Sequence, residues 1–469
     1  MSDDVTYSRI PNDALERWSI VRACVAGDQA MRAAKLLPYL NPQDKSPDNK
    51  ERNASYVERA VYYNATGRTL NGLLGIAFKK DPSIQFPDYL DYLRTSADGE
   101  GNSIYQQSQV VVSDLLICGR CGLLADIVEP NVPVIKFYGP ENIINWRYEN
   151  GKLAMLVLAE TVERYSGYEL EYLVQYHEYE LVDGRCIVRL WQQNDDGAFA
   201  PVLVKDANGE EVEELVLQSK SKRSFDYIPF QWVGSRGNDS NIDDVPLYPL
   251  AKLNVAHYRN SADYEDSVFL VGQAQPWISG LTEEWRDYLQ KQGTAYVGSR
   301  SPFLLPENGA FGFAQPAPNS LVKEAMDQKE AQMVALGARL LDQNAIQVTA
   351  TQSDNDKEVS TSILSMCVAN TNEAYQTVIR WCADMLDKPM TEEEAQASYK
   401  INQDYSRVKI DAPALASLVA AWQAGVIAKP DLRAYLRSEG IIATERTDDA
   451  IDDDLETEGP ALGLSDANA

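Results

Sequence analysis

The spacing of apolar residues changes twice along this chain of 469 residues. Up to about residue 118, and again from Leu247, it follows the 3.6-residue period of amphipathic helices. Between Gly122 and Val233 it alternates every second residue, which is typical of strands. In that region Asn150-Gly151 and Asp183-Gly184 supply the positive φ angles of two-residue hairpin turns. The sequence therefore predicts an α+β fold with an antiparallel β region between two helical ones.

The two periods also place the individual elements. Helices are predicted at 11–40, 51–78, 103–118, 247–271, 282–290, 319–342, 357–388, 413–424 and 429–439, and strands at 276–279, 295–297, 303–305 and 399–410. The helix over 357–388 would be the longest, at about 45–50 Å. Residues 41–50 are polar and broken by proline, which indicates a linker.

Two polar segments stand apart from this pattern. Residues 343–357 lie between two long helices and lack helical periodicity, which suggests a functional loop. Residues 444–469 hold nine acidic side chains and one arginine. Such a segment cannot pack a core, so a disordered acidic tail is expected.

Charge and composition exclude several classes of protein. The chain has 43 Lys and Arg against 70 Asp and Glu, a net charge of −27. A free-standing protein that reads DNA sequence usually has a basic face, so that class is disfavoured, whereas a protein that lets nucleic acid pass is not. No basic and apolar leader is visible at the N-terminus, and the most apolar stretch, 110–128, contains three charged residues. We expect no membrane association and a reducing compartment.

Motifs for catalysis and metal binding are weak. Leu73 stands where a phosphate-binding loop would need lysine, and Cys118 and Cys121 form a lone CxxC without two further ligands at a matching spacing. The two histidines, His177 and His257, are about 80 residues apart and are interpreted as structural. The sequence thus predicts no catalytic residue, no metal and no cofactor. A hydrolase that uses a carboxylate pair remains an alternative, because 70 acids guarantee many candidate pairs.

Three stretches, together with the order of elements, carry a family resemblance. They are 52–82 (RNASYVERAVYYNATGRTLNGLLGIAFKKDP), 261–269 (SADYEDSVF) before Gln275-Pro276, and 401–406 (INQDYS). Over residues 11–443 the chain resembles the portal proteins of tailed bacteriophages. None of these stretches is a catalytic signature. Another virion ring or connector protein is therefore a further alternative.

The resemblance implies a portal architecture with wing, helical stem, α/β clip, tunnel loop and helical crown. The corresponding boundaries are 1–46 for an N-terminal helical arm, 47–246 for the wing, 247–273 and 319–342 for the stem helices, 274–318 for the clip, 343–357 for the tunnel loop, 358–411 for the long wing helix and strand, 412–443 for the crown and 444–469 for the disordered tail. Long helices with a modest apolar stripe bury it against copies of themselves in a ring, which agrees with this expectation.

The resemblance also implies a role and partners. A non-enzymatic dodecameric ring would occupy one capsid vertex and conduct double-stranded DNA without reading its sequence. Its partners would be the terminase large subunit, which hydrolyses ATP, the head–tail adaptor, and the major capsid and scaffold proteins. Its location would be the virion, and the host cytoplasm during assembly. A mostly acidic or neutral bore would keep the duplex sliding, because basic walls multiply phosphate contacts.

Candidate site residues follow from the same resemblance, each with a plainer alternative. The tunnel loop would present Gln343, Asn344, Gln347, Thr349, Thr351, Gln352 and Lys357 to DNA, or would be a solvent loop. The stem would offer Lys323, Lys329 and Arg339 to phosphates, or these would pair with acids such as Glu324 and Glu330. The clip would contact partners through Trp285, Arg286, Tyr288, Lys291 and Arg300, or these would be ordinary packing or surface residues.

Overall fold

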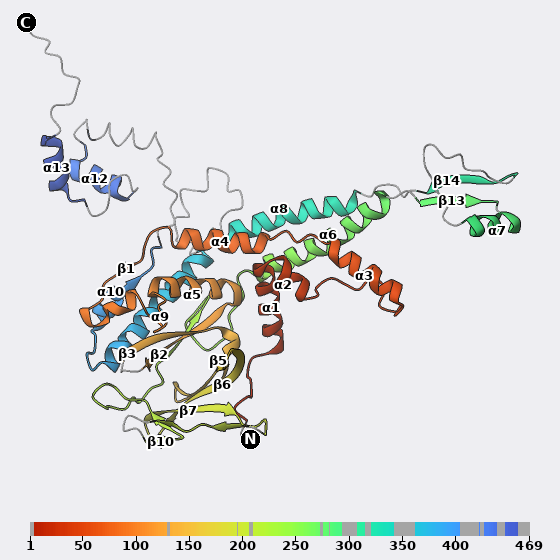
Figure 1. The fold of residues 1–469 in the computed structure, drawn as a ribbon. Coiled ribbons are helices and arrows are strands. Elements are labelled where there is room, and N and C mark those ends of the chain that lie inside the picture. The colour runs from red at the N-terminus through yellow and green to blue at the C-terminus, as the bar shows by residue number, and fades with distance from the viewer. Residues whose placement is uncertain are drawn as a thin grey trace, which may run out of the picture. The chain divides into compact units, whose positions relative to one another are not determined.

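The computed structural model describes residues 4–128, 132–194, 196–205, 210–272, 275–280, 282–292, 307–314, 320–341, 362–403, 422, 426–438 and 446–457. The chain divides into two compact units, Met1–Gln403 and Asp404–Ala469. The first unit mixes helices and sheets, as the two apolar periods predict (Figure 1).

The predicted helices over 11–40 and 51–78 are each divided in two, whereas the helix predicted over 103–118 is confirmed to within one residue. The helices of this region are α1 (Asn12–Ala26), α2 (Asp28–Ala33), α3 (Pro47–Arg59), α4 (Ala65–Ala77), the 3₁₀ helix η1 (Asp88–Arg94) and α5 (Ile104–Cys118). The predicted helix over 11–40 breaks at Gly27, whose φ of 98° is open to glycine at little cost. The predicted helix over 51–78 breaks before Asn64, whose side chain accepts a hydrogen bond from the Gly67 amide and caps α4. The predicted linker ends early, because Ser46 caps α3.

The antiparallel region forms two sheets. One has the order β11 (Leu215–Val216), β7 (Arg185–Gln193), β6 (Glu169–Val182), β5 (Lys152–Ser166) and β4 (Ile143–Glu149), with β8 (Phe199–Pro201) paired to β7. The other is β12 (Phe230–Gly234), β2 (Arg120–Val128) and β3 (Val132–Tyr138). A short pair, β9 (Val204–Lys205) and β10 (Glu211–Val212), stands apart. The predicted hairpin turns are confirmed, since Asn150, Gly151, Asp183 and Gly184 all have positive φ.

Helix α9 (Ile363–Met385) packs against the three-stranded sheet and α5, and its buried residues form the centre of the first unit. It has 23 residues, about 35 Å, and lies within the helix predicted over 357–388, of which 357–361 are outside the described residues. The expectation that it is the longest helix was wrong, because the helix Tyr248–Gly272 has 25 residues. The Ser362 side chain caps it by accepting a hydrogen bond from the Ser365 amide, which fixes the start at Ile363.

The segment after α9 also differs from the prediction. A capping box between Thr391 and Glu394 starts α10 (Glu392–Ser398). The predicted strand over 399–410 is reduced to β15 (Tyr399–Lys400), which pairs with β1 (Ser83–Ile84). Asn372 then engages the backbone of Ile401 in place of a ladder partner. Residues 404–410 lie outside the described part of the chain.

Between the β region and α9 the chain forms α6 (Tyr248–Gly272), β13 (Gln275–Ser279), α7 (Glu283–Gln292), β14 (Ala310–Ala314) and α8 (Leu321–Leu341). Helices α6, α7 and α8 confirm the predictions to within three residues. Strand β14, which pairs with β13, was not predicted. The predicted strands 295–297 and 303–305 lie outside the described residues.

The second unit holds α12 (Lys429–Ser438) and α13 (Asp448–Thr457). Helix α12 was predicted, whereas 448–457 was expected to be disordered. Asp452 of α13 lies 2.5 Å from both Lys429 Nζ and an Arg433 nitrogen of α12, and these ion pairs give the acidic segment a partner that composition does not reveal. The described part of the chain does not include the expected helix over 413–424, except for residue 422. It also does not include the residues after 457.

Candidate functional site

Helices α6 and α8 run along each other in opposite directions and are the most extensively packed pair of helices in the described chain (Figure 1). Met333 and Leu340 of α8 are buried, as are Leu250 and Val255 of α6. Helix α6 also contacts α1, α3 and α4, so the pair is attached to the N-terminal helices. Helix α8 carries the predicted stem candidates Lys323, Lys329 and Arg339, and α7 carries the described clip candidates.

Asn254 attaches α6 to the segment between α3 and α4. It is completely buried, and its Oδ1 accepts hydrogen bonds from the Thr66 amide, the Thr66 hydroxyl and the Tyr62 hydroxyl at 2.9–3.1 Å. Its Nδ2 donates to the Tyr63 carbonyl at 2.7 Å. A buried amide with four hydrogen bonds holds the helix in one register, because sliding would break all four and leave the Thr66 amide without an acceptor.

A second attachment lies further along α6. Asp266 is buried and accepts hydrogen bonds from Arg52 at 2.7 and 2.5 Å and from Arg59 at 3.2 Å, both on α3. The Tyr56 hydroxyl donates to Asp263 at 2.7 Å. Arg52 and Arg59 place two positive charges on α3, and two aspartates place negative charges on α6. The acidic end of α6 is therefore neutralised where it meets α3.

His257 and Glu330 connect α6 to α8. Nε2 of the buried His257 lies 3.3 Å from Glu330 Oε1. The sequence interpretation of His257 as a structural residue agrees with this position, and Glu330 as its partner was not predicted. Likewise His177 lies 3.1 Å from Glu160 within the larger sheet. The spacing of apolar residues does not indicate either pair. His257 and Glu330 are 73 residues apart, and His177 and Glu160 meet only because β5 and β6 pair.

The three basic candidates on α8 have different surroundings. Lys323 is exposed, and Lys329 donates to the Ala325 carbonyl at 3.4 Å. Neither lysine forms the alternative ion pair with Glu324 or Glu330 in the described part of the chain, since Glu324 accepts from Ser320 and Glu330 faces His257. The Arg339 side chain lies outside the description. Contact with phosphate stays a prediction for all three.

The described clip candidates lie together on α7. The rings of Trp285 and Tyr288 meet edge to face with centroids 5.4 Å apart, while Arg286 and Lys291 are exposed. The two rings contact each other while Tyr288 is 48% exposed, so contact of the α7 residues with a partner stays a prediction. Arg300 lies outside the described residues, and so does every tunnel-loop candidate: Gln343, Asn344, Gln347, Thr349, Thr351, Gln352 and Lys357.

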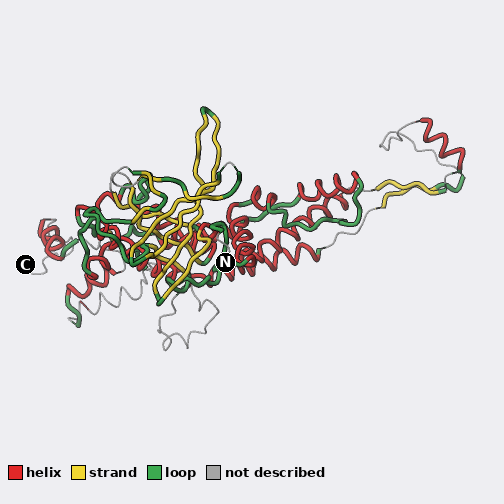
Figure 2. Tube along the Cα trace, turned by 90° about the horizontal axis from the view of Figure 1, so that it is seen from below, coloured by secondary structure: helices red, strands yellow, loops and turns green. Residues whose placement is uncertain are grey.

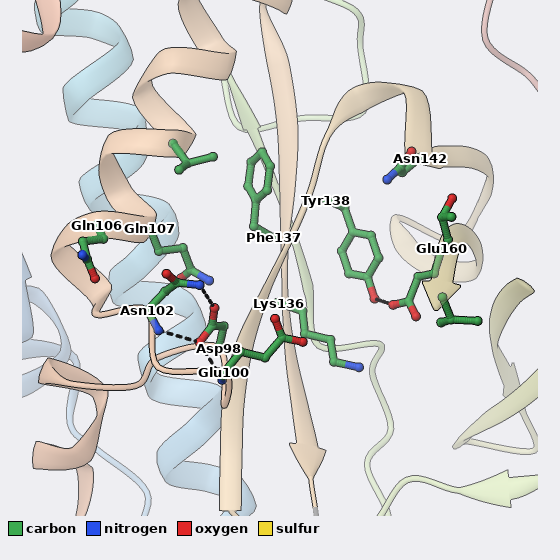
Figure 3. Close-up of a pocket in the computed structure, with 13 residues that line it drawn as sticks. Asp98, Glu100, Asn102, Gln106, Gln107, Lys136, Phe137, Tyr138, Asn142 and Glu160 are labelled. Carbon is green, nitrogen blue, oxygen red and sulfur yellow. Dashed lines mark hydrogen bonds between the residues drawn. The ribbon is translucent and has the colours of Figure 1, made fainter. Parts of the chain in front are cut away.

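The hydrolase alternative can be examined at a polar pocket of about 540 Å³ (Figure 3). Asp98 and Glu160 are among the side chains that line it. Burial acts to raise the pKa of Glu160, but hydrogen bonds from His177 and Tyr138 outweigh it and lower that pKa to about 2. Burial of Asp98 is likewise outweighed by hydrogen bonds from the Asn102 side chain and nearby backbone amides, so its pKa is also lowered. A carboxylate-pair hydrolase needs one acid whose pKa is raised, and these two do not provide it.

Because the pKa of Glu160 is lowered in the folded protein, the free energy of unfolding depends on pH in the acid range. Its ordinary value is 4.5, so ionised Glu160 stabilises the fold above that pH, and this contribution is lost as the pH falls from about 4.5 to about 2. Glu160→Gln should lower the free energy of unfolding at pH 7 by about 2–3 kcal/mol and flatten this acid limb. Urea unfolding between pH 2 and pH 7 measures both effects, and an unchanged acid limb would contradict the assignment.

The cysteines offer no metal site in the described structure. All six are buried, and burial raises the pKa of Cys118 and of Cys121, which keeps both thiols protonated. Among the described residues, no group of three His, Cys, Asp or Glu side chains is placed to hold a metal ion. None of the described helices is both long and apolar enough to cross a membrane.

Part of the chain matches a family model, and most of it is similar to chains in solved structures. A family model described as "Domain of unknown function (DUF4055)" matches residues 246–386, which include α6, α7, α8 and α9. No curated protein matches. The virion of a native gene transfer agent particle contains a similar chain, with 13% identity, coverage of 91% of this chain and 93% of that one, and a TM-score of 0.41. Two neck structures are also similar. For the empty particle, computed with C6 symmetry, the identity is 14%, the coverage 91% and 93%, and the TM-score 0.41. For the neck of the native particle, computed with C12 symmetry, the identity is 13%, the coverage is 92% of this chain and 94% of that one, and the TM-score is 0.39. These similarities are too weak to establish a common fold.

Proposed function

We propose that this chain is a subunit of the portal ring of a tailed-phage capsid, a dodecamer through which double-stranded DNA is packaged and ejected. The sequence resemblance over residues 11–443 supports the proposal, and so does the order of described elements: N-terminal helices, a β region, a long helix, a small α/β segment, a second long helix and α9. The terminase and the head–tail adaptor would dock on the segment 275–314, and virion localisation follows.

One observation carries this proposal. The α6–α8 pair is fixed to the N-terminal helices by buried polar contacts, yet it leaves large apolar side chains in solvent. Val268 and Leu270 of α6 are 48% and 49% exposed, and Val334 of α8 is 74% exposed. Water-exposed apolar residues on a firmly anchored helix pair favour burial against neighbouring subunits. Neighbours on both sides of every subunit are what a closed ring supplies.

The charge of α8 suits a channel that does not grip DNA. Its charged residues are Lys323, Glu324, Asp327, Lys329, Glu330 and Arg339, which sum to a net charge of zero. Among the side chains that the structure describes, the exposed ones that follow Glu330 are uncharged: Ala331, Gln332, Val334, Ala335 and Ala338. Such a surface gives few phosphate contacts, so a duplex can slide past it without breaking strong interactions at each step.

The tunnel-loop role is tested in the virion. Replacing residues 347–352 with Gly and Ser should leave ring assembly intact and lower the yield of DNA-filled particles at least tenfold, because the proposed polar contacts with DNA are removed. The control replaces the exposed residues 41–45, which precede the Ser46 cap of α3, with Gly and Ser and should package normally. DNA-filled particles at the unaltered yield would remove the loop assignment.

Another virion ring or connector protein is the second candidate, because the exposed apolar residues also fit a ring without a packaging role. A terminase-dependent packaging assay separates the two. Heads assembled without this chain should package no DNA if the chain is the portal. They should package DNA but fail to join tails if the chain is a connector added later.

A further inference from the structure

Strands β5 and β6 extend beyond their sheet as a two-stranded ribbon, residues 161–174, which we name the tyrosine arm (Figure 2). Neighbouring strands stop short of it: β4 pairs with β5 only as far as Leu158, and β7 pairs with β6 only from Gln175 onward. Both edges of the arm are therefore unpaired. A two-stranded ribbon alone in water is marginally stable, so this one needs a partner surface.

The register gives the arm two unlike faces. Side chains directly opposite each other share a face, which puts Tyr165, Leu170, Tyr172 and Val174 together. These four are 69%, 40%, 65% and 45% exposed. Thr161 and Glu163 lie on the same face, where Glu163 accepts a hydrogen bond from the Tyr165 hydroxyl at 2.9 Å. The other face carries the cross-strand pairs Arg164–Glu171 and Val162–Leu173, and its apolar pair is half-buried. The face with the two tyrosines is therefore the one that leaves its large apolar side chains in solvent.

A concave apolar surface is present elsewhere on the same chain. The groove, of about 770 Å³, lies between the segment after α2, helix α3 and α6, and its lining includes Leu36, Leu37, Tyr39 and Val57. Lys35 is exposed at its rim, and Arg259 nearby donates to the Leu36 carbonyl at 3.0 Å. At its base the buried Tyr258 hydroxyl has no hydrogen-bond partner among the described residues. The groove is apolar with a basic rim.

The charges of arm and groove are opposite. The arm has three carboxylates, Glu163, Glu169 and Glu171, and one arginine, a net charge of −2. In the groove lining Arg32 is already paired with Asp28 at 2.7 Å, which leaves Lys35 and Glu58, and Arg259 nearby brings the net charge of these three to +1. Complementary charge around complementary apolar surfaces favours one orientation of docking.

We propose that the tyrosine arm of one subunit docks in the α2–α3 groove of a second copy of this chain. Arm and groove share no residue, so the contact is head to tail. Contacts of that kind close into rings when the rotation between subunits permits it. The inference rests on the proposed ring and identifies a subunit contact within it. Tyr165 and Tyr172 are its anchors, because buried tyrosines dominate the energy of interfaces.

Two variants disrupt the contact from opposite sides. The arm variant is Tyr165→Ser/Tyr172→Ser, and the groove variant is Lys35→Glu/Tyr39→Ser. All four residues are exposed, so both variants should fold, which circular dichroism checks. The control, Arg164→Ser/Glu171→Ser, alters the opposite face of the same arm and keeps its net charge. Mass photometry over a dilution series should show rings of both variants dissociating at a concentration at least about tenfold higher than wild type, and the control matching wild type.

Mixing the variants identifies the direction of the contact. At a concentration where each variant alone is monomeric, the mixture contains one intact pairing, the arm of the groove variant with the groove of the arm variant. The expected product is a heterodimer. Wild-type rings with variants as resistant to dilution as wild type would overturn the arm contact and leave the ring proposal standing. A wild type that never associates would overturn both.

Discussion

Replacing Arg22 with Met should lower the free energy of unfolding of the first unit by about 3 kcal/mol at pH 7. Arg22 of α1 donates to both oxygens of Asp114 on α5 at 3.0 and 3.1 Å and to both oxygens of Glu141 at 2.5 and 2.8 Å. The Asp114 side chain is only 9% exposed, so the substitution leaves an ionised carboxylate buried without its partner. Urea unfolding followed by tryptophan fluorescence measures the loss.

The same substitution should cost less in acid. Burial raises the pKa of Asp114 even in the wild type, and Arg22 opposes that rise. Without the guanidinium the pKa rises further, so the carboxyl takes up a proton and becomes neutral as the pH falls. The difference from wild type is therefore expected to be larger at pH 7 than at pH 5.

Arg17→Met on the same helix is the matched control. Arg17 pairs with Asp13 across one turn, and the Asp13 side chain is 73% exposed, so the carboxylate left behind stays in water and the loss should cost less than about 1 kcal/mol. Equal losses for the two substitutions, or an Arg22 effect that is independent of pH, would contradict the burial of Asp114 as the cause.

Asn254→Ala is the second substitution with a large expected effect. It removes four hydrogen bonds and leaves the buried Thr66 amide unpaired, whereas the Tyr63 carbonyl keeps its hydrogen bond from the Ala65 amide. The orphaned amide costs about 1–3 kcal/mol and each further lost hydrogen bond about 1 kcal/mol, so we expect a loss of about 3–4 kcal/mol. Because these groups attach α6 to the segment before α4, amide hydrogen exchange should quicken in α6 and in the first turn of α4 before it quickens elsewhere.

Thr66→Val isolates one of those bonds. It removes the hydroxyl that donates to Asn254 at 2.9 Å and should cost about 1 kcal/mol. The double variant should cost less than the two single losses together, since the shared hydrogen bond is then lost only once. Strict additivity would show that Asn254 does not organise this contact.

Features governed by neighbouring residues were predictable from the sequence. The Asn150-Gly151 and Asp183-Gly184 turns need positive φ, and those residue types supply it locally. The start of helix α5 is fixed by a capping box between Ser103 and Gln106, which are three residues apart in the sequence. The break at Gly27 was missed because apolar periodicity continues across it, so a tolerated glycine and a terminating one look alike.

Features that depend on distant residues were not predictable. Helix α13 has an acidic composition typical of disorder, and only its ion pairs with α12 supply a partner. Asn254 and Thr66 are 188 residues apart, so no motif connects them. For the candidate site, the sequence placed Lys323, Lys329 and the α7 residues on helices. It did not identify the exposed apolar residues of α6 and α8 as a set, because exposure depends on how the helices pack.

The mass and shape of the purified protein test the central claim most directly. Mass photometry at micromolar concentration, with negative-stain imaging of the same sample, should show annular particles with a central hole and a mass of about 630 kDa, twelve times the chain mass of 52.3 kDa. A well-folded monomer of 52.3 kDa that forms no annular particle at any concentration or ionic strength would contradict the account.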